Sequence, residues 1–228
     1  MSLELHVLAD ADGAAARTAE VLAAAARDAL AARGVAHLSL AGGSTPRRAY
    51  EQLGALIDDW SAVHLWFGDE RCVGADDPES NYRMVAETLH ATGAHIHRIA
   101  GELGAEAAAS AYAAELSEVL GPAPLDLALL GLGEDGHTAS LFPGHAEVLD
   151  REAICLPVHD APKPPPDRVT LSMGVLLRAR QIVLLAAGEG KREPLDAVLA
   201  GPNPATPASL LAEGALELIV DEAAHPSG

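Results

Sequence analysis

Several features common in other proteins are scarce in this chain. Among its 228 residues, 3% are aromatic and only two are cysteine. Cys72 and Cys155 are too few for a disulfide framework, and neither belongs to a C-x-x-C pair. No apolar run approaches the roughly 20 residues that span a bilayer, and the first ten residues lack the pattern of a signal peptide. We therefore expect a cytoplasmic protein with an aliphatic core and no membrane partner.

Positive charge is also scarce. The chain has 15 Lys and Arg against 33 Asp and Glu, a net charge of −18. Nucleic acid and anionic membranes need a basic surface, so neither is expected as a partner, whereas a small anion needs only a few local cations. Only Lys163 and Lys191 are lysines. A lysine retained in an arginine-biased chain can mark a place that needs a compact ammonium, although chance is the alternative.

Segments typical of strands and helices alternate along the chain at roughly 30-residue spacing. This pattern predicts βαβ units, a mainly parallel sheet and helices on both faces. No repeat or long linker divides the chain, so we expect one α/β domain over residues 1–228. The expected strands are 3–8, 35–41, 63–67, 96–99, 126–131, 153–158, 181–187 and 216–220. The expected helices are 12–33, 46–57, 81–92, 102–120 and 189–199, with a helical stretch that follows 168–171 and ends at 179.

The segment 125–137 is the most informative, because an apolar run ends in three glycines, two carboxylates and a histidine. In a parallel sheet such residues gather at the carboxyl edge, where ligands bind. His137 can exchange a proton near neutral pH, and its alternative is a buried structural histidine. Residues 131–136 also match G-x-G-x-x-G, the dinucleotide fingerprint. However, Pro143 and Gly144 interrupt the helix that this fingerprint requires, and the acid expected after the second strand is missing.

Three further segments hold candidate binding residues. In 42–46, glycines precede Ser44, Thr45 and a proline, which predicts a capped helix start able to bind a phosphate. A capped helix with no ligand is the alternative, and no P-loop lysine follows. In 68–71, Asp69 and Glu70 are candidates for a base or an orienting group and Arg71 for binding an oxyanion, unless the segment is a solvated loop.

The third feature is a pair of separated cations, Arg168 and Lys191. A planar guanidinium and a compact ammonium suit one phosphate, and the alternative is that both are surface charges. The remaining histidines show no reliable metal-ligand spacing, with His95-x-His97 as the weak exception. No Gly-x-Ser-x-Gly turn and no cysteine nucleophile motif support a covalent acyl-enzyme.

Taken in order, these segments resemble the 6-phosphogluconolactonase family, within the wider glucosamine-6-phosphate isomerase/6-phosphogluconolactonase superfamily. The resemblance rests on 40–46, 66–71, 80–82, 131–144, 168–172 and 188–191 and covers nearly the whole chain. It implies a Rossmann-like α/β fold and hydrolysis of 6-phospho-D-glucono-1,5-lactone to 6-phospho-D-gluconate in the oxidative pentose phosphate pathway. It also implies no cofactor and no metal. We expect a monomer that acts on this small sugar phosphate.

The resemblance also implies roles for individual residues. His137 is similar to a general base, and Asp69 and Asp135 to acidic residues of the pocket, either of which is able to orient the imidazole. Arg71 is similar to an arginine near the substrate. The implied phosphate clamp consists of Gly43, Ser44, Thr45, Arg168 and Lys191.

The related isomerases are the main alternative, with a non-catalytic sugar-phosphate-binding protein as another. Isomerases carry an additional glutamate after the histidine, in a His-x-Ala-Phe-Asn-Glu-Pro pattern. Phe142 occupies the matching position here. Because phenylalanine cannot transfer a proton, this difference favours the lactonase.

Overall fold

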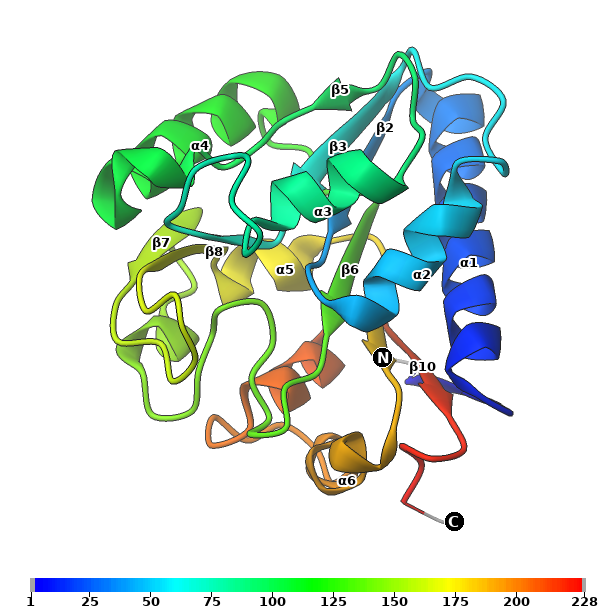
Figure 1. Ribbon diagram of the computed structural model, residues 1–228, viewed down its shortest axis with the longest axis vertical. Helices are drawn as coiled ribbons and strands as arrows, with labels where there is room; N and C mark the ends of the chain where they lie inside the picture. The colour runs from blue at the N-terminus through cyan, green and yellow to red at the C-terminus, as the bar shows by residue number, and fades with distance from the viewer. Residues whose placement is uncertain (1–2, 227–228) are drawn as a thin grey trace.

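A fully parallel sheet of seven strands forms the centre of the molecule, in the order β1-β10-β9-β6-β2-β3-β5 (Figure 1). This computed structural model describes residues 3–226, so the two residues at each end of the predicted domain lie outside the described part. The α/β architecture predicted from the alternating segments is confirmed. The strands are β1 (Glu4–Leu8), β2 (Ala36–Leu40), β3 (Val63–Phe67), β5 (His95–Ile96), β6 (Leu127–Gly131), β9 (Ile182–Ala186) and β10 (Leu216–Asp221).

The order of the strands reverses between β2 and β6. From β2 the chain proceeds outward through β3 to β5, and from β6 it proceeds in the other direction through β9 to β10. Connections that diverge in this way leave a crevice at the carboxyl ends of the two central strands. The segments 42–46 and 131–137 follow these two strands, so the topology brings them to one crevice.

Helices cover both faces of the sheet. The long helix α1 contacts β1, β2, β9 and β10 and packs against α2, as Figure 1 shows. It starts after Asp10, whose carboxylate accepts from the Gly13 N–H, a cap that was not predicted, and it ends at Arg33 as predicted, with Gly34 at φ +74° as the C-cap. The helices are α1 (Ala11–Arg33), α2 (Ser44–Leu53), α3 (Asn81–Thr88), α4 (Ala105–Leu120), α5 (Met173–Arg178) and α6 (Arg192–Leu199).

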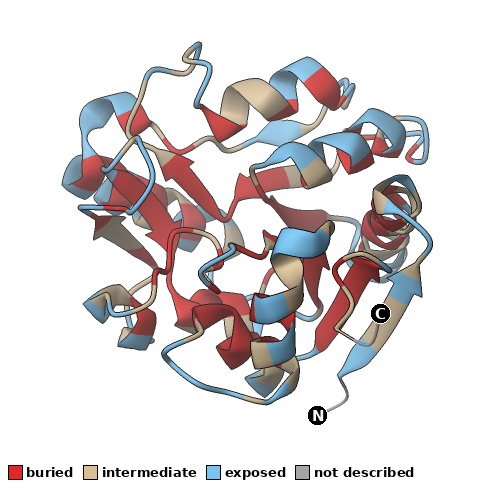
Figure 2. Ribbon diagram, turned by 60° about the horizontal axis from the view of Figure 1, so that its bottom comes forward, coloured by how far each residue is buried: buried red, intermediate tan, exposed pale blue. Residues whose placement is uncertain are grey.

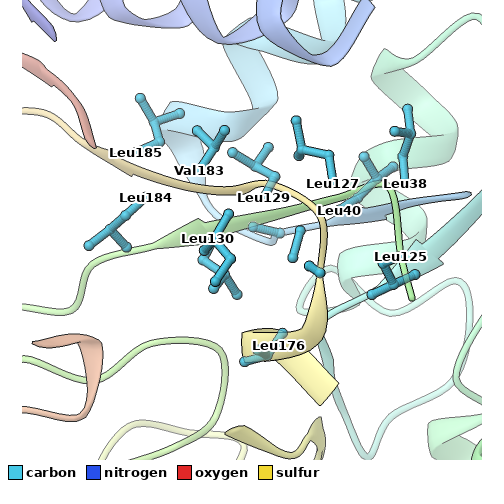
Figure 3. Close-up of a cluster of buried hydrophobic side chains, with 14 of the residues drawn as sticks. Leu38, Leu40, Leu125, Leu127, Leu129, Leu130, Leu176, Val183, Leu184 and Leu185 are labelled. Carbon is cyan, nitrogen blue, oxygen red and sulfur yellow. The ribbon is translucent and has the colours of Figure 1, made fainter. Parts of the chain in front are cut away.

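The core is aliphatic and lies on both sides of the sheet. Leu129 and Val183 point toward α1, whereas Leu130 and Leu184 point toward α5 (Figure 3). All four side chains are at most 1% exposed. A strand buried on both faces has no polar side, which explains the unbroken apolar runs of β6 and β9. Figure 2 shows these buried strands between helices whose outer surfaces are exposed.

A second sheet was not predicted. β4 (Asp69–Arg71), β8 (Arg168–Leu171) and β7 (Cys155–Val158) pair antiparallel in the order β4-β8-β7. The interpretation of 68–71 as a loop after a strand was therefore wrong for its last three residues. Three consecutive charged residues carry no apolar alternation, and their partner strand is about a hundred residues away. Their strand conformation depends on that distant pairing.

Several element boundaries also differ from the predictions. The helix expected at 46–57 is Ser44–Leu53, and the strand expected at 96–99 is His95–Ile96. Short 3₁₀ turns precede α4 and α6, and a further 3₁₀ helix, Pro207–Glu213, was not predicted. Such turns are too short to show a helical period in the sequence. Within residues 3–226, no helix is long and apolar enough to cross a membrane.

Candidate active site

A cavity of about 330 Å³ opens where β2 and β6 end. Six of the predicted site residues line it: Gly43, Asp69, Arg71, His137, Arg168 and Lys191. They come from segments that span about 150 residues of sequence, and the crevice between β2 and β6 brings them together. The other three predicted residues, Ser44, Thr45 and Asp135, are not among the described residues that line the cavity. Asp135 nevertheless belongs to the site because it contacts His137.

His137 and Asp135 form an imidazole–carboxylate pair in the tight turn after β6. The Nδ1 atom of His137 lies 2.5 Å from Oδ1 of Asp135, and the backbone N–H of His137 donates to the same oxygen. An ionised carboxylate only accepts, so Nδ1 carries a proton, and in the neutral form of this imidazole the lone pair is on Nε2. Partial burial raises the pKa of Asp135, but the imidazole charge and the hydrogen bonds outweigh it and lower that pKa overall. Asp135 thus stays ionised and fixes the tautomer of His137.

Gly133 makes room for this pair. A Cβ at this position would lie 2.0 Å from Nδ1 of His137 and 2.6 Å from Oδ1 of Asp135. The backbone of Gly133 also donates to the carbonyl of His137, closing the turn at 2.8 Å. Glycine is required at this position by the close approach of the side chains, since any other residue would separate the acid from the imidazole.

Asp69 has a different role from Asp135. Its carboxylate is buried and accepts from the Ser140 hydroxyl at 2.6 Å and from the Asn81 amide at 3.1 Å. These bonds link β4 to the start of α3 and to the segment that follows His137. From the sequence, either Asp69 or Asp135 was able to contact the imidazole, and in the structure Asp135 does so. Asp135 touches His137, and Asp69 holds the surrounding segments in place.

Glu70 is neither a free base nor part of a solvated loop. It is 2% exposed, and its carboxylate accepts from the backbone N–H groups of Arg71, Asn81 and Tyr82, each at 2.8 Å. The Ser80 hydroxyl donates to it as well, at 3.0 Å. Burial raises its pKa, against the effect of these hydrogen bonds. Glu70 therefore fixes the start of α3, which is a structural role.

The start of α2 differs from the predicted cap. The N-cap is Gly43, with φ +110°, and no side chain caps the helix, so the expectation that Ser44 or Thr45 acts as the cap was wrong. Both residues instead belong to the first turn, and Arg47 supplies the first N–H that bonds back to Gly43. In the described structure the preceding N–H groups find no acceptor. They remain available to an anion at the positive end of the helix dipole.

The predicted cations surround the same cavity. Arg168 is 5% exposed and lies on β8 beside Arg71 of β4, while the half-buried Lys191 precedes α6. Burial lowers the pKa of both Arg168 and Lys191. Arg71 donates to the Glu79 carbonyl at 2.6 Å and pairs with its carboxylate. The alternative, that both Arg168 and Lys191 are surface charges, is wrong for Arg168.

Phe142, Asn81 and Lys163 are among the lining residues that the predicted set of site residues did not include. Phe142 is buried with its ring centroid 4.7 Å from the ring of His137 and 5.6 Å from the Arg168 guanidinium carbon. Asn81 lines the cavity from the start of α3, and Lys163 lines it from the proline-rich loop. Signals existed for both, because Asn81 lies in one of the family motifs and Lys163 is one of only two lysines.

Fold and site together define a class of protein. A doubly wound α/β chain carries an imidazole, in contact with a carboxylate, in a crevice lined by cations. These are the features of an enzyme that performs acid–base chemistry on a small anion.

Comparisons with known proteins identify the family. The model of the family "Glucosamine-6-phosphate isomerases/6-phosphogluconolactonase" matches residues 9–220. The chain is 36% identical to a 6-phosphogluconolactonase of Mycobacterium tuberculosis, covering 90% of this chain and 89% of that protein. It is 38% identical to one of Streptomyces coelicolor, over 76% of this chain and 74% of the relative. The chain belongs to this family.

Solved structures agree with the family assignment. A 6-phosphogluconolactonase from Leishmania guyanensis superimposes with a TM-score of 0.87 at 30% identity, covering 98% of both chains. A monomeric glucosamine-6-phosphate deaminase superimposes with a TM-score of 0.83 at 22% identity, over 97% of this chain and 98% of that one. The second likeness is one of fold alone, so the two activities in the family must be separated by the site.

Proposed function

We propose that this protein hydrolyses 6-phospho-D-glucono-1,5-lactone to 6-phospho-D-gluconate, a step of the oxidative pentose phosphate pathway. The relatives that carry the name 6-phosphogluconolactonase support this activity. The observation that carries the proposal is the hydrogen bond between Asp135 and Nδ1 of His137, because it leaves Nε2 as a base at a cation-lined cavity.

His137 supplies the acid–base chemistry in this proposal. Its Nε2 takes a proton from a water as that water attacks the carbonyl carbon C1 of the lactone. The imidazolium, stabilised by ionised Asp135, then returns the proton to the ring oxygen as the C1–O bond breaks. Histidine is the side chain that most often serves as both general base and general acid near neutral pH. Donors near the developing oxyanion are Arg71 and the backbone N–H groups of the glycine-rich turn.

The phosphate group binds at the other end of the substrate. The N–H groups of Ser44 and Thr45 at the start of α2, together with Lys191 and Arg168, form the clamp in this proposal. Gly43 brings the backbone close to the anion. Because the phosphate is remote from C1, its binding energy serves to orient the lactone carbonyl against His137.

The isomerase or deaminase activity of the family is the second candidate. The shared fold favours it, and Phe142 opposes it. Phe142 is 1% exposed and stands beside His137, where isomerases place the carboxylate that opens the sugar ring. We expect no release of ammonia from glucosamine 6-phosphate. Release at rates comparable to lactone hydrolysis would favour the deaminase.

The test is acid release from freshly prepared phosphogluconolactone, measured with and without enzyme. We expect acceleration by the wild-type protein and a loss of about 10²–10⁴-fold in His137→Ala with folding retained, as for removal of a general base. No acceleration by the wild-type protein would refute the activity, and tight product binding without turnover would favour a binding protein. Unchanged turnover in His137→Ala would refute only the role of His137.

We also propose that the chain acts as one domain and as a monomer in the cytoplasm, without a nucleic-acid partner. One hydrophobic core extends over both faces of the central sheet, which supports a single domain. Cys72 and Cys155 are both free thiols, which suits a reducing compartment. The net charge of −18 supports a small-molecule partner rather than nucleic acid. Sedimentation of the purified protein tests the monomer.

A further inference from the structure

Lys163 stands out because of how the cations of this chain are paired. Nine of the thirteen arginines form ion pairs with carboxylates. In the described part of the chain neither lysine forms one, although acidic residues outnumber basic ones by about two to one. Both lysines line the same cavity. The protein has a net charge of −18, so two unpaired ammonium groups at one cavity give that cavity a positive charge that the rest of the molecule does not share.

The loop that carries Lys163 is held by Arg168. The guanidinium donates through Nη2 to the Lys163 carbonyl at 2.8 Å and through Nε to the Pro165 carbonyl at 3.1 Å. The remaining nitrogen, Nη1, has no protein partner in the described structure and is left for a ligand. Phe142 packs under the same guanidinium, which fixes its plane. Two of the three guanidinium nitrogens of Arg168 therefore hold the loop.

The two lysines lie close enough to affect each other. After burial, the charge of Lys163 contributes to lowering the pKa of Lys191, against the raising effect of Glu134. Like charges that line one cavity repel each other, and a bound anion reduces that repulsion. A sugar phosphate carries a charge of about −1.5 to −2 near pH 7, which one ammonium does not neutralise. The pair fits a phosphate better than Lys191 alone does.

We propose that Lys163 binds the anionic group of the substrate opposite Lys191, and that Arg168 is a positioning residue for the loop that carries Lys163. This inference rests on the proposed function for the identity of the substrate. It extends the clamp predicted from the sequence by one residue, and it gives Arg168 a role beyond its own charge. Lys163 is exposed on a loop, so its replacement does not threaten the fold.

The first experiment compares Lys163→Met with Lys163→Arg. Removing one charged hydrogen bond at a partly exposed site should raise KM for the phosphorylated lactone roughly tenfold, with kcat changed less than about threefold. Lys163→Arg keeps the charge and should recover most of the loss. The effect should shrink between about 0.05 and 0.5 M salt, because exposed charges are screened. The matched control is Arg178→Met, which removes an exposed cation that does not line the cavity.

A binding measurement separates this inference from the proposed function. Calorimetry with 6-phosphogluconate and with D-gluconate needs no turnover, so it tests Lys163 even if lactone hydrolysis is not observed. We expect Lys163→Met to weaken binding of the phosphorylated acid only. Equal effects on both acids, or no effect on either, would overturn the role of Lys163.

A double-mutant cycle tests the positioning role of Arg168. Arg168→Lys keeps a positive charge but lacks the planar fork by which two separate nitrogens reach the Lys163 and Pro165 carbonyls. In that background, Lys163→Met should raise KM only about two- to threefold, because the loop no longer holds the ammonium in place. If the two substitutions are additive, Arg168 does not act through Lys163. Lactone hydrolysis with gluconolactone itself and circular dichroism report whether each variant is folded.

Discussion

The ring of Phe142 lies against the ring of His137, with the centroids 4.7 Å apart at an angle of 48°. The same phenylalanine lies under the Arg168 guanidinium. One buried apolar side chain thus supports both the proposed base and a proposed phosphate ligand.

We predict that Phe142→Leu impairs catalysis and substrate binding but leaves the fold nearly as stable as in the wild type. The change should cost less than about 1.5 kcal/mol of unfolding free energy, because it nearly conserves the apolar volume. It should lower kcat several-fold, because the imidazole loses the ring that packs against it. It should also raise KM several-fold, because the guanidinium loses a cation–π contact worth roughly 0.5–1 kcal/mol. Steady-state kinetics and urea unfolding measure both effects. Phe67→Leu, a buried phenylalanine that does not line the cavity, is the control, and kinetics equal to that control would contradict the prediction.

Gly133→Ala should abolish most of the activity through one added methyl group. The Cβ would lie 2.0 Å from Nδ1 of His137, so the His137–Asp135 bond cannot form. Misplacement of a catalytic group by about 1 Å can cost on the order of 10²-fold, and we expect a loss of kcat of at least this size. Gly74→Ala, where nothing lies within 4 Å of the new Cβ, should leave kcat unchanged. A Gly133→Ala enzyme with wild-type kcat would show that the pair is not needed.

Glu70→Gln should reduce stability more than it alters the chemistry. The amide offers one acceptor oxygen in place of two, so at least one of the backbone N–H groups of Asn81 and Tyr82 loses its partner. A buried donor without a partner costs about 1–3 kcal/mol, and unfolding in urea should show a loss in this range. The pH dependence of kcat should stay as in the wild type. A shifted kinetic pKa would indicate that Glu70 takes part in proton transfer.

A cluster of histidines should make the protein sensitive to acid. His37, His64 and His95 occupy adjacent register positions on β2, β3 and β5, and Nδ1 of His64 lies 2.9 Å from Nε2 of His97. Burial, followed by the charges of the neighbouring histidines, lowers the pKa of His64 to about 4. Burial also lowers the pKa of His37, against the raising effect of Asp126.

The sign of this effect follows from proton linkage. In the unfolded chain these imidazoles take up protons near pH 6.5, whereas in the folded protein His64 resists protonation down to about pH 4. The contribution to stability is therefore complete above pH 6.5 and is lost as the pH falls from about 6.5 to about 4. Two carboxylates face the cluster: Glu115 contacts His97, and Asp126 accepts from the His37 backbone N–H.

Urea unfolding of wild type and His64→Gln at pH 7.5 and pH 5 tests this prediction. The loss of unfolding free energy between the two pH values should be smaller in His64→Gln. His90→Gln, an exposed histidine outside the cluster, should lose as much as the wild type. Equal losses in all three proteins would show that the cluster does not control acid stability.

Local sequence patterns predicted most of the fold because the forces that form its elements act over short distances. The apolar runs of β6 and β9 and the glycine at 34 each determine structure within a few residues. The segments 42–46 and 131–137 were found for the same reason, since each places its chemistry directly after a strand.

The tertiary structure alone decided how distant segments meet. Pairing with a distant strand makes Asp69–Arg71 a strand. Asp135 rather than Asp69 contacts the imidazole, and Glu70 accepts from the backbone at the start of α3. The tertiary structure also brought Lys163 to the cavity through hydrogen bonds from Arg168. Antiparallel pairing and buried side-chain bonds join residues that are up to a hundred positions apart, and the periodicity of one segment carries no information about its distant partner. The sequence by itself therefore determined which residues are candidates for the chemistry, and the folding of the chain determined which of them touch.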